Sequence, residues 1–465
     1  MNEQLLAQID EKIAACRADL ARTTINLVNI KSVQEAPLPG APFGAGAKKV
    51  LDTVLQMGEA EGFYCQDYGV GVVSTALKAG QPDLGIWLHG DVVPAGNGWD
   101  YEPYNAVEYK GCIIGRGATD NKGQLAATFH LLRIFKELNV PLKYNPAMYV
   151  GSNEETGMAD LAGLPDNEDA KGFLNVCTPP RLSLVPDSGF PVGYGGKGGL
   201  TVTYKSNAPL SGWQFTAGSA EAPGRATAVF ENTILPAELP ECTVEENTAF
   251  CETPPRHGAH PDPNGNMITK LSAALLETLT LPENERRLLE FFKLVSLDTN
   301  GKKLGIATEC EDMSPLTVFA KSVTCENGYP CIALNIRYPI GITYEEIIEK
   351  VSAVAESYGL SLQSEVRGVN PYRLDPDSAM VKLLWEAANE VTGDDKAPFT
   401  IGGGTYAHRL PNAYVFGSNG NLPPDDFKAG HGGAHGIDEA VSLDRLQRSM
   451  RIYARALLRL NEAEW

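Results

Sequence analysis

The chain has 465 residues, 43% hydrophobic and 21% charged, which is the composition of a globular protein with two or three domains. A formal net charge of −19 disfavours binding to nucleic acid or to an anionic membrane surface, because phosphate groups would be repelled. Nine cysteines without a CxxC pair indicate free or buried thiols, and no signal peptide or membrane span is visible, so we expect a cytoplasmic protein.

Residues 1–191 alternate predicted helices and strands. Apolar residues at near-helical spacing predict an amphipathic helix over residues 4–29. The segments "GVVSTAL", "LGIWLHGDVV" and "PAMYVG" are typical of strands, and "QLAATFHLLRIFKEL" is typical of a helix. This alternation predicts an α/β catalytic domain, with a mostly parallel sheet and helices on both faces.

Residues 192–369 follow a different pattern. Strands, prolines and Gly-rich turns mix there with helical segments such as "MITKLSAALLETL" and "TYEEIIEKVSAVAESYG". We predict a separate α+β domain in this segment. Residues 370–465 return to helix, strand, loop and helix, so they are predicted to complete the first domain, with the middle segment inserted into it.

His89 and Asp91, in "LHGDVVP", stand two residues apart at the end of a predicted buried strand. Their side chains therefore point to the same side. A histidine that binds a metal usually donates its other ring N–H to a carboxylate, and Asp91 offers one. By itself a His-x-Asp pair is more often incidental.

Further ligand-type residues occur in four other stretches. Each has an ordinary explanation as a helix cap, a turn residue or a solvated loop residue. Together, two imidazoles and three carboxylates at strand ends or in Gly-rich loops suit a pair of Zn²⁺ ions that share one carboxylate. The candidates are Asp120 in "GRGATDNKGQ", Glu154 and Glu155 in "SNEETGM", Asp187 in "VPDSGF", and His431 and His435 in "GHGGAHGIDEAV".

Five motifs carry a resemblance to a known family: "LHGDVVP", "GRGATDNKG", "NEETG", "PDSGFP" and "HGIDE". In this order and with these gaps, the chain resembles the M20 family of co-catalytic zinc metallopeptidases over nearly its whole length. Within that family, "IGGGTYAHRLPN", "NIRYP" and the length are similar to the PepV-like (Xaa-His, carnosinase-type) dipeptidases. The resemblance implies hydrolysis of dipeptides or other small peptides with two Zn²⁺ ions per chain, or with Mn²⁺ or Co²⁺ in their place.

The resemblance also implies the ligands of both ions. His435 is chosen over His431 because "HGIDE" matches the family pattern His-x-x-Asn/Asp-Glu. The peptide bond after the bridging aspartate is cis in the family, which here is the bond between Asp120 and Asn121. The implied ligands are His89, Asp120 and Asp187 at one site, and Asp120, Glu155 and His435 at the other.

Two residues are implied to support the reaction without binding metal. Glu154 would be the general base, and Asp91 would be the hydrogen-bond partner of His89. Neighbouring residues that leave a strand point in opposite directions. One glutamate of the pair can therefore bind metal while the other faces the bridging water.

The inserted domain resembles the family's lid. In "RHGAHPDPNGNMITKL", the spacing to a proline and an asparagine matches His257 rather than His260. The role implied for His257 is a hydrogen bond to the developing oxyanion. Arg337, in "NIRYP", matches the lid arginine that binds a substrate carboxylate, for which a bidentate guanidinium is suited.

The Gly-rich loop with Gly404 and Thr405 is implied to offer backbone N–H groups to a substrate carboxylate. The chain also departs from the PepV-like pattern. These lids usually carry an asparagine before a Val-Pro, and the corresponding stretch here is "GSAEAPGRA". Either this contact is lost or the substrate preference differs.

Other enzyme classes fit poorly. "GYGGKGG" lacks the Ser or Thr that follows the lysine of a P-loop, and the chain has no G-x-S-x-G of a serine hydrolase. Two alternatives stay open: an amidohydrolase or deacylase of N-acyl amino acids on the same metal site, and a non-catalytic peptide-binding relative. Because the insert is long enough to supply both halves of a lid, we expect a monomer.

Overall fold

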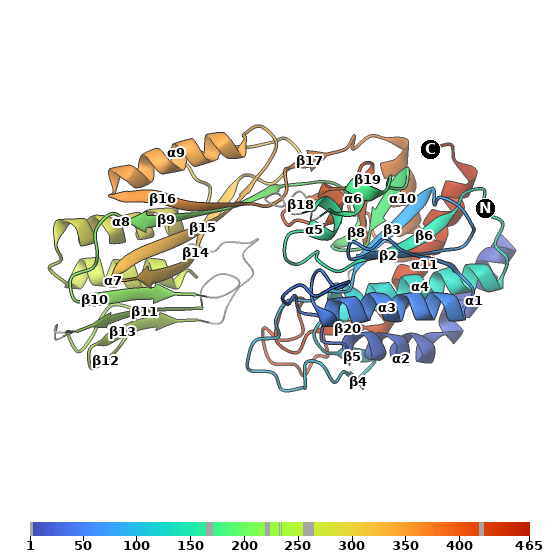
Figure 1. Ribbon diagram of the computed structural model, residues 1–465, viewed down its shortest axis with the longest axis horizontal. Helices are drawn as coiled ribbons and strands as arrows, with labels where there is room; N and C mark the ends of the chain where they lie inside the picture. Colours follow the sequence, from blue (N-terminus) through green and yellow to red (C-terminus); the bar gives the residue numbers. More distant parts are fainter. Residues whose placement is uncertain are drawn as a thin grey trace. The chain divides into compact units, whose positions relative to one another are not determined.

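The computed structural model describes residues 3–163, 171–218, 224–231, 233, 235–253, 265–417 and 423–465. The chain forms two compact units, whose elements are labelled in Figure 1. The first unit contains Met1–Gly195, Arg373–Phe399 and Thr405–Trp465, and the second contains Gly196–Tyr372 and Thr400–Gly404. The sequence did not indicate that residues 400–404 belong to the second unit.

The main sheet of the first unit has nine strands among the described residues: β1 (Tyr64–Asp67), β2 (Val72–Ala76), β3 (Leu84–His89), β6 (Pro146–Gly151), β7 (Leu182–Val185), β8 (Gly189–Gly196), β17 (Tyr372–Arg373), β18 (Phe399–Ile401) and β19 (Ala413–Gly417). Their order is β1-β2-β6-β3-β7-β19-β8-β17, and β18 also pairs with β8. The strands β6, β3, β7 and β19 pair in parallel. β1, β2 and β8 are added in antiparallel pairs. The predicted α/β class is confirmed, with parallel pairing concentrated in the centre of the sheet.

The central strands are buried along their whole length. Every residue of β3, "LGIWLH", and of β6, "PAMYVG", is buried. Near-continuous apolar runs of this kind are expected for parallel strands that are covered on both faces. The two strands pair from Leu84 opposite Pro146 to His89 opposite Gly151. Their carboxyl ends therefore lie at one edge of the sheet, and the residues that follow them are neighbours.

Helices surround this sheet and share one apolar core with it. The longer ones are α1 (Glu3–Ala15), α2 (Arg17–Val28), α3 (Ala45–Ala60), α4 (Gly123–Glu137), α10 (Ala379–Thr392) and α11 (Leu443–Glu462). Shorter helical segments are η1 (Ala118–Lys122), α5 (Ala159–Ala162), α6 (Phe173–Val176) and η2 (Tyr406–His408).

The prediction of a single helix over residues 4–29 was wrong. The chain turns at Cys16, whose φ of −80° and ψ of 3° depart from helical values, and two helices result. The sequence pattern continues across this turn because both helices bury apolar side chains, such as Ile13 and Leu20, in the same core.

A small sheet joins two distant parts of the first unit. It contains β4 (Val107–Tyr109), β5 (Cys112–Ile114) and β20 (Ala440–Ser442), in the order β20-β5-β4. Ala440 pairs with Ile114 in an antiparallel register. This pairing brings the loop before β20 alongside the turn that follows β5.

The second unit is α+β, as predicted for the insert. Its sheet has the order β12-β13-β11-β10-β14-β15-β9-β16, and the pairs along it are antiparallel. Figure 1 shows the helices α7, α8 and α9 along this sheet, and residues of each lie in its apolar core. The elements are β9 (Gly198–Ser206), β10 (Trp213–Ala217), β11 (Arg225–Phe230), β12 (Thr243–Glu245), β13 (Thr248–Glu252), β14 (Thr317–Glu326), β15 (Tyr329–Tyr338), β16 (Leu360–Arg367), α7 (Met267–Thr278), α8 (Glu283–Leu297) and α9 (Tyr344–Ser357).

Two cysteines of this unit correct the expectation of free thiols. Cys242 and Cys251 form a disulfide. The pairing of Thr243 with Phe250 continues the hairpin register outward by one residue to these two cysteines. The other seven form no disulfide: Cys16, Cys65, Cys112, Cys177, Cys310, Cys325 and Cys331. Within the part of the chain that the structure describes, no helix is both long and apolar enough to cross a membrane.

Candidate metal centre

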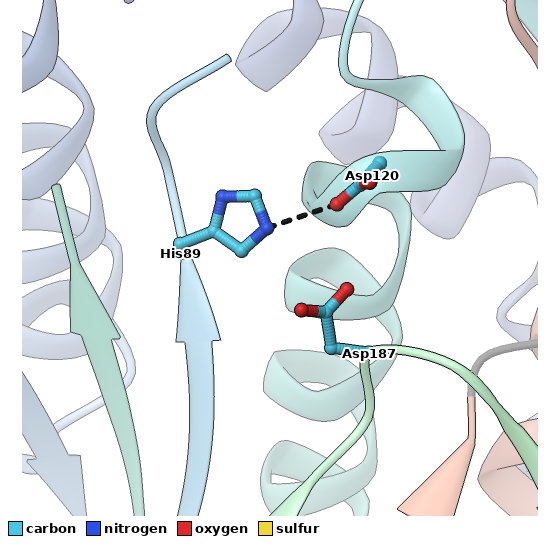
Figure 2. A group of neighbouring side chains, drawn as sticks. All are labelled: His89, Asp120 and Asp187. Atoms are coloured by element: carbon cyan, nitrogen blue, oxygen red, sulfur yellow. Dashed lines mark hydrogen bonds and ion pairs between the residues drawn. The ribbon is translucent and has the colours of Figure 1, made fainter. Parts of the chain in front are cut away.

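Two groups of ligand-type side chains meet in the first unit and share one aspartate. In each group, one ligand atom from every residue lies within 4.8 Å of the others. Figure 2 shows the first group, in which the imidazole and the two carboxylates face a common point. The groups are His89, Asp120 and Asp187, and Asp120, Glu155 and His435.

Parallel strands bring three of these residues to one edge of the sheet. His89 is the last residue of β3, and Asp187 lies two residues beyond the end of β7. Glu155 follows β6, which ends at Gly151. Because the carboxyl ends of neighbouring parallel strands meet at the same edge, ligands of open α/β sheets gather at such positions.

Asp120 lies between the two histidines. It stands in η1 with a non-helical φ of −123° and ψ of 90°, and the peptide bond to Asn121 is cis. Its Oδ1 is 2.9 Å from Nε2 of His89, and its Oδ2 is 3.2 Å from Nε2 of His435. The two oxygens of one carboxylate therefore face two different ligand groups, as a bridging carboxylate must.

His435, which the family pattern favoured over His431, lies beside the other candidate ligands. Nε2 of His435 lies 3.0 Å from the carboxylate of Glu155. His431 belongs to a separate group with Asp100 and Asp438, and its Nδ1 is 2.6 Å from Oδ2 of Asp438. The structure thus places His435, and not His431, beside Asp120.

Asp91 contacts the site differently from the sequence-based expectation. Nδ1 of His89 lies 3.1 Å from the backbone oxygen of Asp91 and 3.6 Å from its carboxylate Oδ1, so the carbonyl is the closer partner. The carboxylate instead accepts the backbone N–H groups of Glu154 and Glu155, each at 3.1 Å. Asp91 therefore holds the turn that carries both glutamates.

Glu154 is buried next to the two groups without belonging to either. Its side chain is 8% exposed, and Oε1 has no hydrogen-bond partner among the described residues. Burial raises the pKa of Glu154 well above its usual value, and the neighbouring charge of Asp187 raises it further. A carboxyl group in such surroundings is suited to exchange a proton with a bound molecule.

Electrostatics show that the site gathers more negative charge than its histidines offset. Burial raises the pKa of Asp187 well above its usual value, and the charge of Asp120 adds to this. Burial also raises the pKa of Glu155, again with Asp120 as the next cause. For Asp120 burial acts in the same direction, but hydrogen bonds from His435 and His89 outweigh it and lower its pKa. Cations bound among these carboxylates would remove the repulsion.

Asp160 and Tyr406 support the site, and the sequence analysis missed them. Oδ2 of Asp160 accepts the backbone N–H groups of Ser152 and Asn153 at 2.8 and 3.0 Å, and the hydroxyl of Tyr406 at 2.5 Å. These bonds hold the end of β6 just before the two glutamates. Tyr406 stands in the quoted "IGGGTYAHRLPN" motif, whereas nothing in the sequence around Asp160 marks it as special.

The residues predicted to bind substrate lie in different parts of the structure. Arg337 lies on β15, where it pairs with Gly199 of β9. A side chain at position 199 would collide with the guanidinium, because an added Cβ there would lie 2.8 Å from Nη1 of Arg337. Its Nε has no hydrogen-bond partner among the described residues, and burial lowers its pKa. Thr405 is buried, and its hydroxyl caps η2 by accepting the N–H of Ala407. His257 lies outside the described residues, and Gly404 is in the second unit.

Lys197 is a cation beside Arg337 that the sequence did not single out. It is buried, and its Nζ donates to the backbone oxygen of Pro315 at 2.8 Å. Burial lowers its pKa to about 8, with the charge of Arg337 as the second cause. The second unit therefore places two positive charges close together.

A family comparison decides the class of this protein. The sequence pattern of peptidase family M20/M25/M40 matches residues 86–459, which is most of the chain and includes every predicted metal ligand. The chain belongs to peptidase family M20/M25/M40.

Relatives of this M20 chain extend over its full length. "Putative dipeptidase YtjP" of Bacillus subtilis (strain 168) is 29% identical over 472 residues, which cover 96% of this chain and 97% of that protein. Human carnosine dipeptidase 1 has a TM-score of 0.60 at 15% identity and covers 98% of this chain and 100% of its own. The di-peptidase Dug1p of Saccharomyces cerevisiae has a TM-score of 0.61 at 15% identity, with 99% of each chain covered. The two solved structures show that the fold is shared.

Proposed function

We propose that this M20 chain hydrolyses dipeptides with two zinc ions, and that the two ligand groups sharing Asp120 hold them. The shared aspartate is the observation that carries the proposal, because its two oxygens face the two histidines at 2.9 and 3.2 Å. The relatives described as dipeptidases support the substrate class.

The donor set fits zinc. Each group offers one imidazole nitrogen and two carboxylates, which are ligand types that Zn²⁺ accepts in catalytic sites. Mn²⁺ and Co²⁺ accept the same ligands, and affinity order alone does not choose among these metals. When bound, the ions would acidify a water molecule and polarise the peptide carbonyl.

Glu154 is the residue we assign to proton transfer. It would accept a proton from the attacking water and return it to the nitrogen of the leaving amine. Asp91 keeps this glutamate in place through the backbone N–H, and Asp160 with Tyr406 fixes the end of β6 before it. The burial that raises the pKa of Glu154 also favours its protonated form, which the second transfer needs.

The second unit is proposed to bind the free carboxylate of the substrate. Arg337 has an unpartnered Nε among the described residues, and a guanidinium binds a carboxylate through two parallel hydrogen bonds. His257 is proposed to stabilise the oxyanion, and Gly404 and Thr405 to offer backbone N–H groups. We further propose a cytoplasmic monomer, since seven of the nine cysteines form no disulfide and the insert is large.

A substrate panel with the zinc-loaded protein tests this function. Dipeptides with free carboxyl termini should be hydrolysed, whereas N-acyl amino acids should be poor substrates. Elemental analysis of the active protein should give two ions per chain, and chelation should abolish turnover. One ion or none would refute the dinuclear site. Preference for N-acyl amino acids would favour the deacylase alternative, and no turnover at all would favour a peptide-binding relative.

A further inference from the structure

Arg116 and Glu439 form a buried ion pair next to the metal centre, and neither belongs to the two ligand groups. Their side chains are 2% and 0% exposed, and Nη1 of Arg116 lies 2.7 Å from Oε2 of Glu439. A buried pair of this kind is costly to desolvate and therefore needs further hydrogen bonds to satisfy its atoms. The partners of these atoms indicate what the pair does.

Glu439 binds the backbone of the turn that carries Asp120. Its Oε2 also accepts the N–H of Gly117 at 3.0 Å, and its Oε1 accepts those of Thr119 and Asp120 at 2.8 and 2.9 Å. A carboxylate has about four acceptor positions, and four donors occupy them here. Glu439 therefore has no free acceptor position for a metal ion, and its carboxylate instead holds the backbone of the turn that carries Asp120.

Arg116 binds the other loop of the centre. Its Nη2 donates to the backbone oxygen of His435 at 3.1 Å, while its Nη1 holds Glu439. The planar fork of a guanidinium holds two acceptors in a fixed geometry, whereas a lysine ammonium is a compact charge on a flexible chain. The turn of Asp120 and the loop of His435 are thus joined through one pair of side chains.

We infer that Arg116 and Glu439 are positioning residues for the ion held by Asp120, Glu155 and His435, an inference that rests on the proposed function. The pair fixes two of the three ligands in this group. The first group depends less on it, because His89 and Asp187 follow strands of the main sheet. Loss of the pair should therefore weaken one ion more than the other.

Zinc binding to the full chain tests the inference, with Arg116→Lys and Glu439→Gln as variants. Stepwise affinities are measured by competition with a chromogenic chelator using Zn²⁺ alone. We expect the ion held by Asp120, Glu155 and His435 to bind about 10- to 100-fold more weakly, as is usual when a residue that orients ligands is lost, and the other ion, which shares only Asp120, to lose less affinity. Arg116→Lys keeps a positive charge beside Glu439, so the test does not depend on whether Glu439→Gln folds.

Arg455→Lys is the matched control. Arg455 also joins a carboxylate, that of Asp10, to a backbone carbonyl, that of Arg451, but it lies on α11 outside the metal centre. Its loss should lower the melting temperature and leave both zinc affinities unchanged. Adding His435→Ala to Arg116→Lys should cause a smaller additional loss at the affected ion than His435→Ala causes in the wild type, because the effects of residues that share a partner are not additive.

Two results would overturn the inference while the proposed function stands. Folded Arg116→Lys and Glu439→Gln proteins could bind both ions with wild-type affinities, as the control should, or could bind both ions equally more weakly. A wild-type chain that takes up fewer than two ions would instead refute the proposed function, and the inference with it.

Discussion

Glu154 and Glu155 are adjacent in the chain, yet their carboxylates have different partners. The carboxylate of Glu155 lies 3.0 Å from His435, whereas Oε1 of Glu154 has no hydrogen-bond partner among the described residues. We predict that Glu154→Gln keeps both ions and loses about 10²- to 10⁴-fold in kcat, the usual contribution of a general base. Glu155→Gln should lose one ion instead. Elemental analysis and turnover distinguish the two variants, and near-normal kcat in Glu154→Gln would refute its assignment.

Arg337 should matter only for substrates with a free carboxylate. Removing one partner of a buried charge pair costs ~2–5 kcal/mol, so Arg337→Ala should lower kcat/KM by about 10²-fold or more. A C-terminally amidated dipeptide should be a poor substrate of the native enzyme and little affected by the substitution. Arg367→Ala, on the exposed edge of the same sheet, is the control and should change neither. Equal losses for acid and amide would make Arg337 a structural residue.

Helices α2 and α4 meet through a buried histidine whose titration contributes to stability. Nε2 of His130 on α4 lies 2.9 Å from the hydroxyl of Thr23 on α2, and burial lowers the pKa of His130 to about 4. The unfolded chain binds this proton near its ordinary pKa of 6.5, so between these values the unfolded state holds more protons. The titration of His130 therefore costs no unfolding free energy above this pH range, and the unfolding free energy falls as the pH drops through it.

Denaturant unfolding of wild type and His130→Gln tests this titration. The loss of unfolding free energy caused by this titration should be about 2 kcal/mol at about pH 5 and almost nothing at about pH 7. Glutamine offers a hydrogen bond to Thr23 but does not titrate. The difference between the two proteins should consequently shift in favour of the variant by this amount on acidification. A difference that stays constant with pH would contradict the lowered pKa.

The whole chain should be a monomer. The second unit is large and has its own core and its own sheet, so lid residues from a partner chain should not be needed. Light scattering at micromolar concentration should give one chain of 50.0 kDa. A stable dimer would contradict this prediction and would require a search for residues that one chain supplies to the other.

The sequence by itself determined the class of the fold and the set of ligand candidates. Buried apolar runs predicted the central strands, and His89 and Asp187 were recognised because they follow such runs. Periodicity could not reveal the break at Cys16, since two helices that face one core carry one continuous pattern. Local pattern also could not show that residues 400–404 belong to the second unit, because that assignment rests on contacts between distant segments.

Only the tertiary structure decided which polar residues support the centre. Asp160, Arg116 and Glu439 act through backbone groups that the fold brings near. Arg116 and Glu439 stand in the motifs "GRGATDNKG" and "HGIDE", but the motifs did not reveal that the two side chains pair or which backbone groups they bind. The family pattern had already favoured His435 over His431, and the structure adds that His431 lies in a separate group with Asp100 and Asp438. The sequence gives the chemical type of each side chain. The pairing of distant segments, such as β5 with β20, determines which of these side chains lie close together.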